Sequence, residues 1–368
     1  MLAWGRDVTL WASRAPRTGL RIPQAGRFAA GCRAPPTRAT EPSEPTGRAA
    51  TGTNRNDGRP QPGSDVRRRA TTDVMMRTHA QPPIGDGRFP VMRDGEIALM
   101  FSGGVDSTAT SIMLAEQHPR VHLLTYRNGY GHWYFHRVRE RYDELVKALG
   151  DHFQWTLVSI KDHFGKLLVN GVLDDYKRYK SGFIWFMGCK MAMHMRSAIY
   201  CLEHGVPRMT DGSNEDTNEM VEQMLVSLTL VRMFYNRYGI DFGTPVYEVR
   251  REESRQLIKK WNLNMGIQVM DRHLCIQPTC VAGELYYMPY LLFNKRVFHD
   301  EPVVAQFIRE KEKIADKMMR KHFAAKGIDL DELVADRKRQ MAEIAAGKRD
   351  KLDAPVASNA DRKAASNF

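Results

Sequence analysis

The stretch IALMFSGGVDSTATSIML, residues 97–114, joins a buried strand to a helix through a glycine-rich turn. The apolar run EIALMF ends at Phe101, and apolar residues at helical spacing follow over 107–117. Residues 102–107 then lie beyond the carboxyl end of a strand, where open parallel sheets bind their ligands. The two glycines let the backbone turn sharply and approach a ligand closely without a Cβ.

This turn has the features of a phosphate-binding site. The helix that follows presents unpaired N–H groups and the positive end of its dipole, and Ser102, Ser107 and Thr108 add hydroxyl donors. Asp106 is an anion in the same turn, so it fits if Mg²⁺ bridges it to phosphates or if it caps the helix. The turn lacks the Gly-Lys-Ser/Thr ending of a Walker A loop and the Gly-x-Gly-x-x-Gly fingerprint.

The bulk properties indicate a protein of a reducing compartment. The chain has 368 residues, enough for one large or two modest domains, and no apolar run reaches the roughly 18 residues of a membrane span. Its five cysteines are too few and too far apart for a disulfide scaffold. We therefore expect a cytoplasmic protein whose thiols serve chemistry or metal binding.

The net charge of +12 lies in the two ends of the chain. Residues 1–90 hold fifteen arginines, no lysine and seven acidic residues, whereas residues 91–308 hold equal numbers of basic and acidic residues. The neutral centre gives no electrostatic argument for a polyanionic substrate, so a small molecule is slightly favoured over tRNA.

The composition divides the chain into four parts. Residues 1–90 are too poor in large apolar residues to offset the entropy of ordering, so we expect a disordered extension. That extension is either an organelle-type leader or the product of a start codon placed too far upstream. Residues 91–300 form the expected catalytic domain, 301–350 a charged helical extension with a break at Gly327, and 351–368 a disordered tail.

Strand and helix patterns alternate from residue 95 to about residue 290, which predicts an α/β fold: a parallel sheet flanked by helices on both faces. The expected strands are 96–101, 120–126, 153–160, 206–210 and 245–249. The expected helices are 107–117, 132–150, 190–205, 217–238 and 252–263.

The motif SGGVDS at 102–107 resembles the signature of the PP-loop ATP pyrophosphatase superfamily, whose fold is of the adenine nucleotide alpha-hydrolase (HUP) type. The resemblance covers about residues 95–285. It implies an enzyme that splits ATP between the α and β phosphates, adenylates a carbonyl or carboxyl oxygen and releases pyrophosphate. A nucleophile then displaces AMP. It also implies ATP and Mg²⁺ as cofactors, bound by Ser102, Gly103, Gly104, Val105, Asp106 and Ser107.

A second stretch, MGCKMAMHMRSAIYCLEHGVPRMTDGSNEDTNEM (187–220), is similar to the sulfur-transferring branch of that superfamily. There a cysteine followed by lysine opens a helix, which matches Cys189 and Lys190; Phe186 stands where many members have a second cysteine. The DGSNED segment at 211–216 resembles the ligand loop of nickel-pincer sulfur transferases, and tRNA thiolases have a related loop. The resemblance implies contacts to ATP from Gly212, Ser213 and Asn214, and to Mg²⁺ from Asp211 or Asp216.

Three cysteines are candidates for the sulfur chemistry: Cys189, Cys275 and Cys280. The resemblance implies that they face ATP together and hold three irons of a [4Fe-4S] cluster, leaving the fourth iron open for a hydrosulfide. Two alternatives stay open: a persulfide with a resolving thiol, or structural cysteines or a zinc site with His273 as a further ligand. Cys201 lies on an apolar helix face and is expected to pack in the core.

Other residues receive weaker assignments. The segment TYRNGYGHWYFH (125–136), with Thr125 at its start, follows the second strand, where the superfamily binds adenine and ribose. Lys190 is a candidate phosphate ligand. His132 and His136 would share a helical face, either as metal ligands or as a polar surface.

We therefore expect ATP-dependent adenylation followed by sulfur transfer to a small molecule, a cofactor precursor or a tRNA. The sulfur would come from a donor protein or from sulfide, and a homodimer is left open. A PP-loop ligase that delivers nitrogen, like cyano-deazaguanine synthases or NAD synthetases, is the alternative enzyme. A non-catalytic nucleotide-binding regulatory protein is the alternative of another class.

Overall fold

The computed structural model describes residues 89–269, 272–274, 278–283, 285–286 and 298–346. The expectations for residues 1–88 and for the tail 351–368 concern parts of the chain outside these ranges, and so does the assignment of Cys275.

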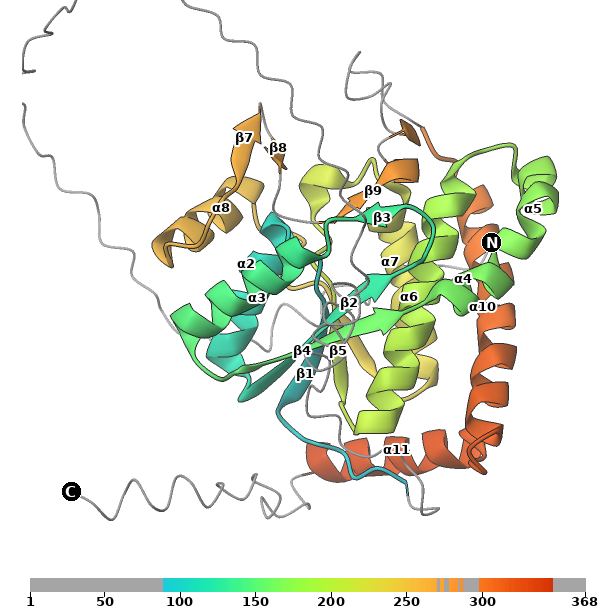
Figure 1. Ribbon diagram of the computed structural model, residues 1–368. Coiled ribbons are helices and arrows are strands. Elements are labelled where there is room, and N and C mark those ends of the chain that lie inside the picture. The colour runs from blue at the N-terminus through green and yellow to red at the C-terminus, as the bar shows by residue number, and fades with distance from the viewer. Residues whose placement is uncertain (1–88, 270–271, 275–277, 284, 287–297, 347–368) are drawn as a thin grey trace, which may run out of the picture. The chain divides into compact units, whose positions relative to one another are not determined.

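Five parallel strands form the central sheet of the described residues, in the order β4-β2-β1-β5-β6 (Figure 1). In that order they span Phe153–Ser159, Arg120–Arg127, Glu96–Met100, Arg208–Thr210 and Asp241–Gly243. β1 pairs with β2 on one side and with β5 on the other, so the order of strands reverses at β1. The carboxyl end of β1 is therefore the switch point at which such sheets bind ligands.

Helices cover both faces of this sheet, as expected for the α/β class. One face carries α2 (Val105–Gln117), α3 (His136–Leu149) and α8 (Arg251–Lys260), whose apolar residues share a core with Ile97 and Leu99. The other face carries α6 (Phe183–His204), α7 (Leu225–Arg237) and α10 (Glu301–Ala324), whose core includes Ala98 and Met100. Alternate residues of β1 thus serve opposite cores, as strand geometry requires.

The remaining elements are short, apart from one helix. Three further helices are α4 (Lys161–Leu167), α5 (Val172–Tyr179) and α11 (Leu330–Ala345). Three single turns of 3-10 helix are η1 (Val169–Gly171), η2 (Glu215–Thr217) and η3 (Val221–Gln223). Two small antiparallel ladders pair β3 (His132–Trp133) with β9 (Thr279–Cys280), and β7 (Ile267–Val269) with β8 (Arg272–Leu274).

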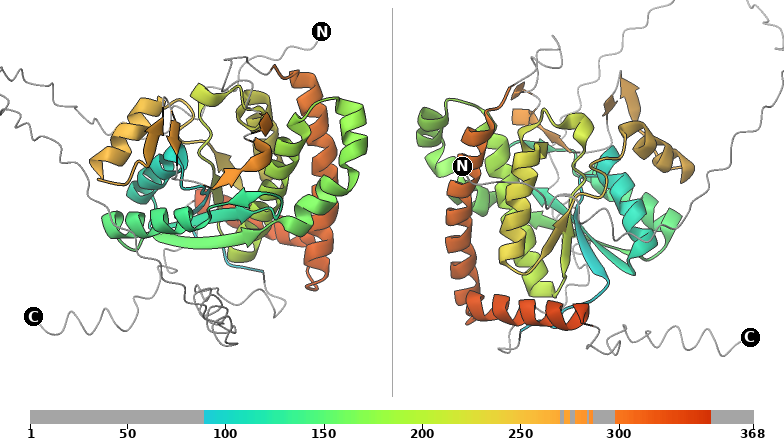
Figure 2. Two further views of the ribbon diagram at one scale, coloured as in Figure 1. Left: turned by 45° about the horizontal axis from the view of Figure 1, so that its top comes forward. Right: turned by 180° about the vertical axis from the view of Figure 1, so that it is seen from behind.

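The charged segment after residue 300 forms two helices that separate at Gly327, as predicted. Gly327 has φ +73°, a left-handed conformation that ends a helix and favours glycine. Helix α10 packs along α6 and α7 (Figure 2) and buries Val304, Phe307 and Ile308 in the core of that face. Within the described ranges, no helix combines the length and apolar character that crossing a membrane requires.

Several element boundaries differ from the sequence prediction. The helix expected from 132 begins at His136, because Gly131 and Tyr134 have positive φ angles and interrupt a helical path. His132 lies in β3 instead, so the prediction that His132 and His136 share a helical face is wrong. The strand expected at 245–249 is also wrong, since this segment is a turn and β6 ends at Gly243.

Two helices begin at other residues than expected. Helix α6 starts at Phe183, seven residues before the predicted start, so Cys189 and Lys190 lie inside the helix rather than at its beginning. Helix α7 starts at Leu225 instead of residue 217, because residues 215–223 form η2 and η3. These shifts change which side chains face the sheet's carboxyl edge.

Candidate functional site

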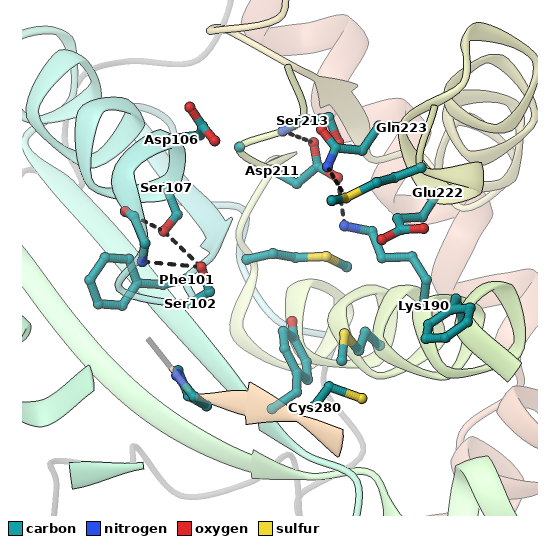
Figure 3. Close-up of a pocket in the computed structure, with 18 of the residues that line it drawn as sticks. Phe101, Ser102, Asp106, Ser107, Lys190, Asp211, Ser213, Glu222, Gln223 and Cys280 are labelled. Carbon is teal, nitrogen blue, oxygen red and sulfur yellow. Dashed lines mark hydrogen bonds and ion pairs between the residues drawn. The ribbon is translucent and has the colours of Figure 1, made fainter. Parts of the chain in front are cut away.

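A pocket of about 390 Å³ lies at the carboxyl edge of the sheet, beside the switch point at β1. The turn after β1, the strand end at Thr125, helix α6, the segment 211–223 and the β3–β9 ladder contribute to its lining. Figure 3 shows Ser102, Asp106 and Ser107 on one side, with Lys190 and Glu222 across from them. Elements far apart in the sequence thus converge on one cavity.

The turn at 102–107 is held by its own hydrogen bonds. Ser102 Oγ lies 3.1 Å from Ser107 Oγ and accepts the Gly104 N–H at 3.3 Å, and Thr108 Oγ1 donates to the Gly103 carbonyl at 3.3 Å. Gly103 has φ +77°, so it needs glycine, whereas Gly104 has φ −71°, an ordinary value. The N–H groups at the start of α2 are therefore arranged before any ligand arrives.

Asp106 is the second residue of α2, and its Oδ1 is buried without a hydrogen-bond partner among the described residues. The N-cap is Gly104, no side chain caps the helix, and the alternative that Asp106 acts as the cap is wrong. Burial raises the pKa of the Asp106 carboxyl, which the charges of Arg251 and Arg255 partly offset. An orphaned buried carboxylate oxygen in a pocket fits a cation or a ligand donor.

Gly212 brings the loop after β5 against the turn at the start of α2. A Cβ at Gly212 would lie 2.8 Å from the backbone N of Ser107 and 3.1 Å from the backbone C of Asp106. Real Cβ atoms do not approach backbone this closely, so any larger residue must displace one of the two segments. Ser213, the next residue, also lines the pocket, and its N–H donates to Asp211 Oδ1 at 3.1 Å.

Lys190 and Asp211 form an ion pair in the pocket lining, with Lys190 Nζ 2.9 Å from Asp211 Oδ2. Asp211 is 1% exposed; burial alone would raise the pKa of its carboxyl, but Lys190 outweighs that effect and the pKa is lowered. Removing one partner of such a pair leaves a buried charge without compensation.

We expect Lys190→Met to lower the free energy of unfolding by about 3–5 kcal/mol at neutral pH, because the Asp211 carboxylate loses its partner. Asp211 has a lowered pKa in the native protein, so the pair's contribution is present above the ordinary aspartate pKa and is lost as pH falls below it. The difference between variant and native protein should therefore shrink below about pH 4.

Chemical denaturation at pH 7 and pH 3.5 measures both effects. Lys177→Met is the matched control, since Lys177 pairs with Asp174 on the exposed surface of α5 at 3.7 Å and should change stability by less than about 1 kcal/mol. Equal losses for the two variants would show that the Lys190–Asp211 pair carries no special energy.

Two of the three candidate cysteines line the same pocket. Cys189 on α6 is buried, and Asn128 Nδ2 donates to its Sγ at 3.5 Å. Burial raises the pKa of the Cys189 thiol to about 12. Cys280 is half-buried on β9, which pairs it with His132.

The three-cysteine ligand set is not assembled within the described ranges. There, no group of three His, Cys, Asp or Glu side chains is placed to hold a metal ion. The described part of the chain supplies two thiols, and the third, Cys275, lies outside it.

Other predicted site residues lie away from the pocket lining. The Asn214 amide is buried and donates to the carbonyls of Val246 and Val249, so it holds the 245–249 turn. Asp216 is exposed and its Oδ2 accepts the Arg251 N–H at 2.9 Å. Cys201 is buried in the core, as expected.

The pocket also includes residues that no sequence pattern singles out. Glu222 on η3 has a buried Oε2 without a partner among the described residues, and burial raises the pKa of its carboxyl. A glutamate within an expected helix at 217–238 has no sequence signal that separates it from a surface residue. The further lining residues of this kind are Trp185, Met193, Thr217, Met220 and Gln223.

Comparison with known proteins finds only distant structural likeness. No protein-family model and no curated protein matches the chain. A tRNA thiolase from Methanococcus maripaludis with its [4Fe-4S] cluster matches over 67% of this chain and 78% of its own, at 14% identity and TM-score 0.34.

Two further solved structures are similar to the same degree. NMN synthetase from Francisella tularensis matches over 60% of this chain and 85% of its own, at 13% identity and TM-score 0.35. A 4-thiouridine synthetase in complex with RNA and bound ATP matches over 64% of this chain and 55% of its own, at 15% identity and TM-score 0.39. Because these TM-scores are low, the activity of this chain is inferred from its own turn at 102–107 and its pocket.

Proposed function

We propose that this chain is an ATP-dependent enzyme that adenylates a substrate, releases pyrophosphate and then transfers sulfur. The observation that supports it is the convergence of the PP-loop, Cys189 and Cys280 on one pocket. A phosphate-binding turn and two thiols in a single cavity suit activation by ATP followed by attack of a sulfur nucleophile.

The phosphates of ATP would lie on the N–H groups of residues 103–107, at the positive end of α2. The same N–H groups would stabilise the charge that develops as pyrophosphate leaves. Arg251, whose side chain also lines the pocket, adds a cation near Asp106 on that side. Thr125, at the end of β2, would border the nucleoside.

Of the three carboxylates proposed for Mg²⁺, Asp106 fits best. Its Oδ1 is buried and unpartnered among the described residues, whereas Asp211 is bound to Lys190 and Asp216 accepts the Arg251 N–H. A bound Mg²⁺ neutralises phosphate charge in such a site. Lys190 is held in its pair with Asp211, so its assignment to a phosphate requires that pair to open when ATP binds.

The sulfur chemistry is assigned to Cys189 and Cys280. With a pKa of about 12, the Cys189 thiol stays protonated at neutral pH until a ligand, a metal or conversion to a persulfide changes its surroundings. A [4Fe-4S] cluster would need Cys275 as third ligand. Iron and acid-labile sulfide content of anaerobically purified protein tests this, with about four irons per chain expected for a cluster and none for persulfide chemistry.

The acceptor is proposed as a small molecule or cofactor precursor, with tRNA as the alternative. Residues 91–308 carry no net charge, which gives no electrostatic preference for RNA. If the purified protein binds tRNA and this binding is lost in moderate salt, tRNA is favoured as the acceptor. The sulfur would come from free sulfide if a cluster holds it, or from a partner protein that delivers sulfane sulfur if Cys189 carries a persulfide, because sulfide cannot form a persulfide without an oxidant.

We expect Cys189→Ser and Cys280→Ser to abolish transfer of radiolabelled sulfur to the acceptor, supplied as sulfide for a cluster or as sulfane sulfur for a persulfide, while leaving ATP affinity within about threefold of the native value. The thiols would act after adenylation, so their loss should not disturb the PP-loop. Cys201→Ala is the matched control on the same helix, because that thiol packs in the core away from the pocket, and it should keep transfer.

A result in which both serine variants still modify the acceptor contradicts a role for these thiols. Nitrogen delivery by a PP-loop ligase then becomes the leading reaction, and labelled ammonia or glutamine in place of sulfide identifies it.

A further inference from the structure

We propose that a second groove, between β4 and α6, binds a small oxyanion through Arg196. The groove has a volume of about 330 Å³, and none of its described lining residues also lines the ATP pocket. Its polar lining comes from β4 and α6 and includes Gln154, Thr156, Ser159, Arg196, Tyr200 and His204.

The groove follows from the position of β4 in the sheet. β4 is the last strand at this edge of the five-stranded sheet, and its register places Gln154 beside His122 and Thr156 beside Leu124. Leu124 belongs to the α6-side core, so the alternate residues 154, 156 and 158 face α6. Gln154 and Thr156 are only half-buried, so this outer face is partly open.

Arg196 projects into the groove from α6 without a hydrogen-bond or ion-pair partner among the described residues, and its Nε is buried. A buried guanidinium N–H without an acceptor is costly, so the arrangement suits a ligand that supplies one. The planar fork of arginine binds carboxylate and phosphate oxygens in a bidentate manner.

The charges around Arg196 leave its positive charge uncompensated. Glu203, the one carboxylate among the described residues that line the groove, is bound by His322 of α10 and by Lys326, which follows that helix. Burial, followed by the charges of Arg196 and His322, lowers the pKa of His163 to about 4. The Asp162 carboxylate acts against this lowering of the His163 pKa, and the charge of Lys166 adds to the lowering.

Neutral groups complete an oxyanion site. Thr156 lines the groove on the strand face turned toward α6, and the Tyr200 ring stacks on His204 with centroids 3.9 Å apart, giving a flat apolar wall. A phosphate or carboxylate on a small molecule therefore fits, with its body against the rings. Arg196 lies seven residues from Cys189 on α6, or about 10 Å along the helix axis.

The test is thermal unfolding of the full chain in inorganic phosphate and, separately, in acetate, at ionic strength held constant with sodium chloride. Saturating ATP keeps the first pocket occupied. We expect the Tm of the native protein to rise by about 2–4 °C at 50 mM phosphate or acetate, and the better anion identifies a phosphorylated or a carboxylated ligand. Arg196→Gln should remove most of that rise.

Arg139→Gln is the matched control, since Arg139 pairs with Asp143 on the exposed side of α3, and it should keep the rise. Without added anion, Arg196→Gln should leave Tm unchanged or higher, because it removes an unpaired charge. A rise that is equal in native protein and Arg196→Gln overturns the proposal, as does a Tm of Arg196→Gln several degrees low without anion. The proposal does not rest on ATP turnover. If ATP fails to bind, the difference between Arg196→Gln and Arg139→Gln in the rise of Tm with added anion can still be measured.

Discussion

Gly212→Ala should lower the free energy of unfolding by about 1–3 kcal/mol and weaken ATP binding at least tenfold, or about 1.4 kcal/mol. The added Cβ would sit 2.8 Å from the Ser107 backbone N and 3.0 Å from its Cα. Both atoms are backbone, so no side-chain rotation relieves the contact. The loop after β5 and the turn at 102–107 must move apart, and the N–H groups that would hold the phosphates move with them.

Gly243→Ala is the matched control for this substitution. Gly243 ends β6, the strand next to β5, and its carbonyl accepts the Asp211 N–H at 3.4 Å. A Cβ there meets no atom within 4 Å, so we expect less than about 0.5 kcal/mol change in stability and no change in ATP affinity. Calorimetric ATP titration and denaturation of both variants provide the comparison. Equal ATP affinities in Gly212→Ala and native protein would show that ATP does not bind at the turn beside Gly212.

Asp106→Asn should reduce ATP-dependent pyrophosphate release by about 100-fold or more while raising the Tm of the ligand-free protein at pH 7. The carboxylate is buried with Oδ1 unpartnered among the described residues, so its charge opposes folding until a cation binds. Loss of activity together with gain of stability is the signature of a group kept for ligand binding.

The gain in stability has a defined pH dependence. Burial raises the pKa of Asp106, so the native protein loses stability as pH rises from the ordinary aspartate value through that raised pKa. The advantage of Asp106→Asn should therefore vanish below about pH 4 and be complete above the raised pKa. Asp143→Asn, at an exposed pair with Arg139, should alter neither activity nor the pH profile. Unchanged pyrophosphate release in Asp106→Asn would show that Asp106 takes no part in the reaction.

The apolar strands and the glycine turn were predictable because their signals are local. EIALMF and RVHLLTY are short runs rich in apolar residues, typical of covered strands, and both form strands in the middle of the sheet. The placement of 102–107 at the carboxyl end of β1 follows from the strand-to-helix junction alone. The alternation of strands and helices then predicts the parallel sheet.

The errors concern residues whose conformation depends on distant partners. PVYEV at 245–249 has strand composition, but the Asn214 side chain binds the carbonyls of Val246 and Val249 and holds the segment as a turn. The resemblance of its loop predicts Asn214 at the nucleotide, and the same contact holds the Asn214 amide outside the pocket lining. Glu222 faces the pocket only because residues 215–223 form two short turns instead of the start of a helix.

The central claim is that this pocket cleaves ATP between its α and β phosphates. The most direct measurement is product analysis of doubly labelled ATP incubated with the full chain, Mg²⁺, sulfide and a pool of small molecules and RNA. The account predicts AMP and pyrophosphate in equal amounts, with release lost in Asp106→Asn and kept in Asp143→Asn. ADP and inorganic phosphate as products, or ATP left intact and unbound, would contradict it.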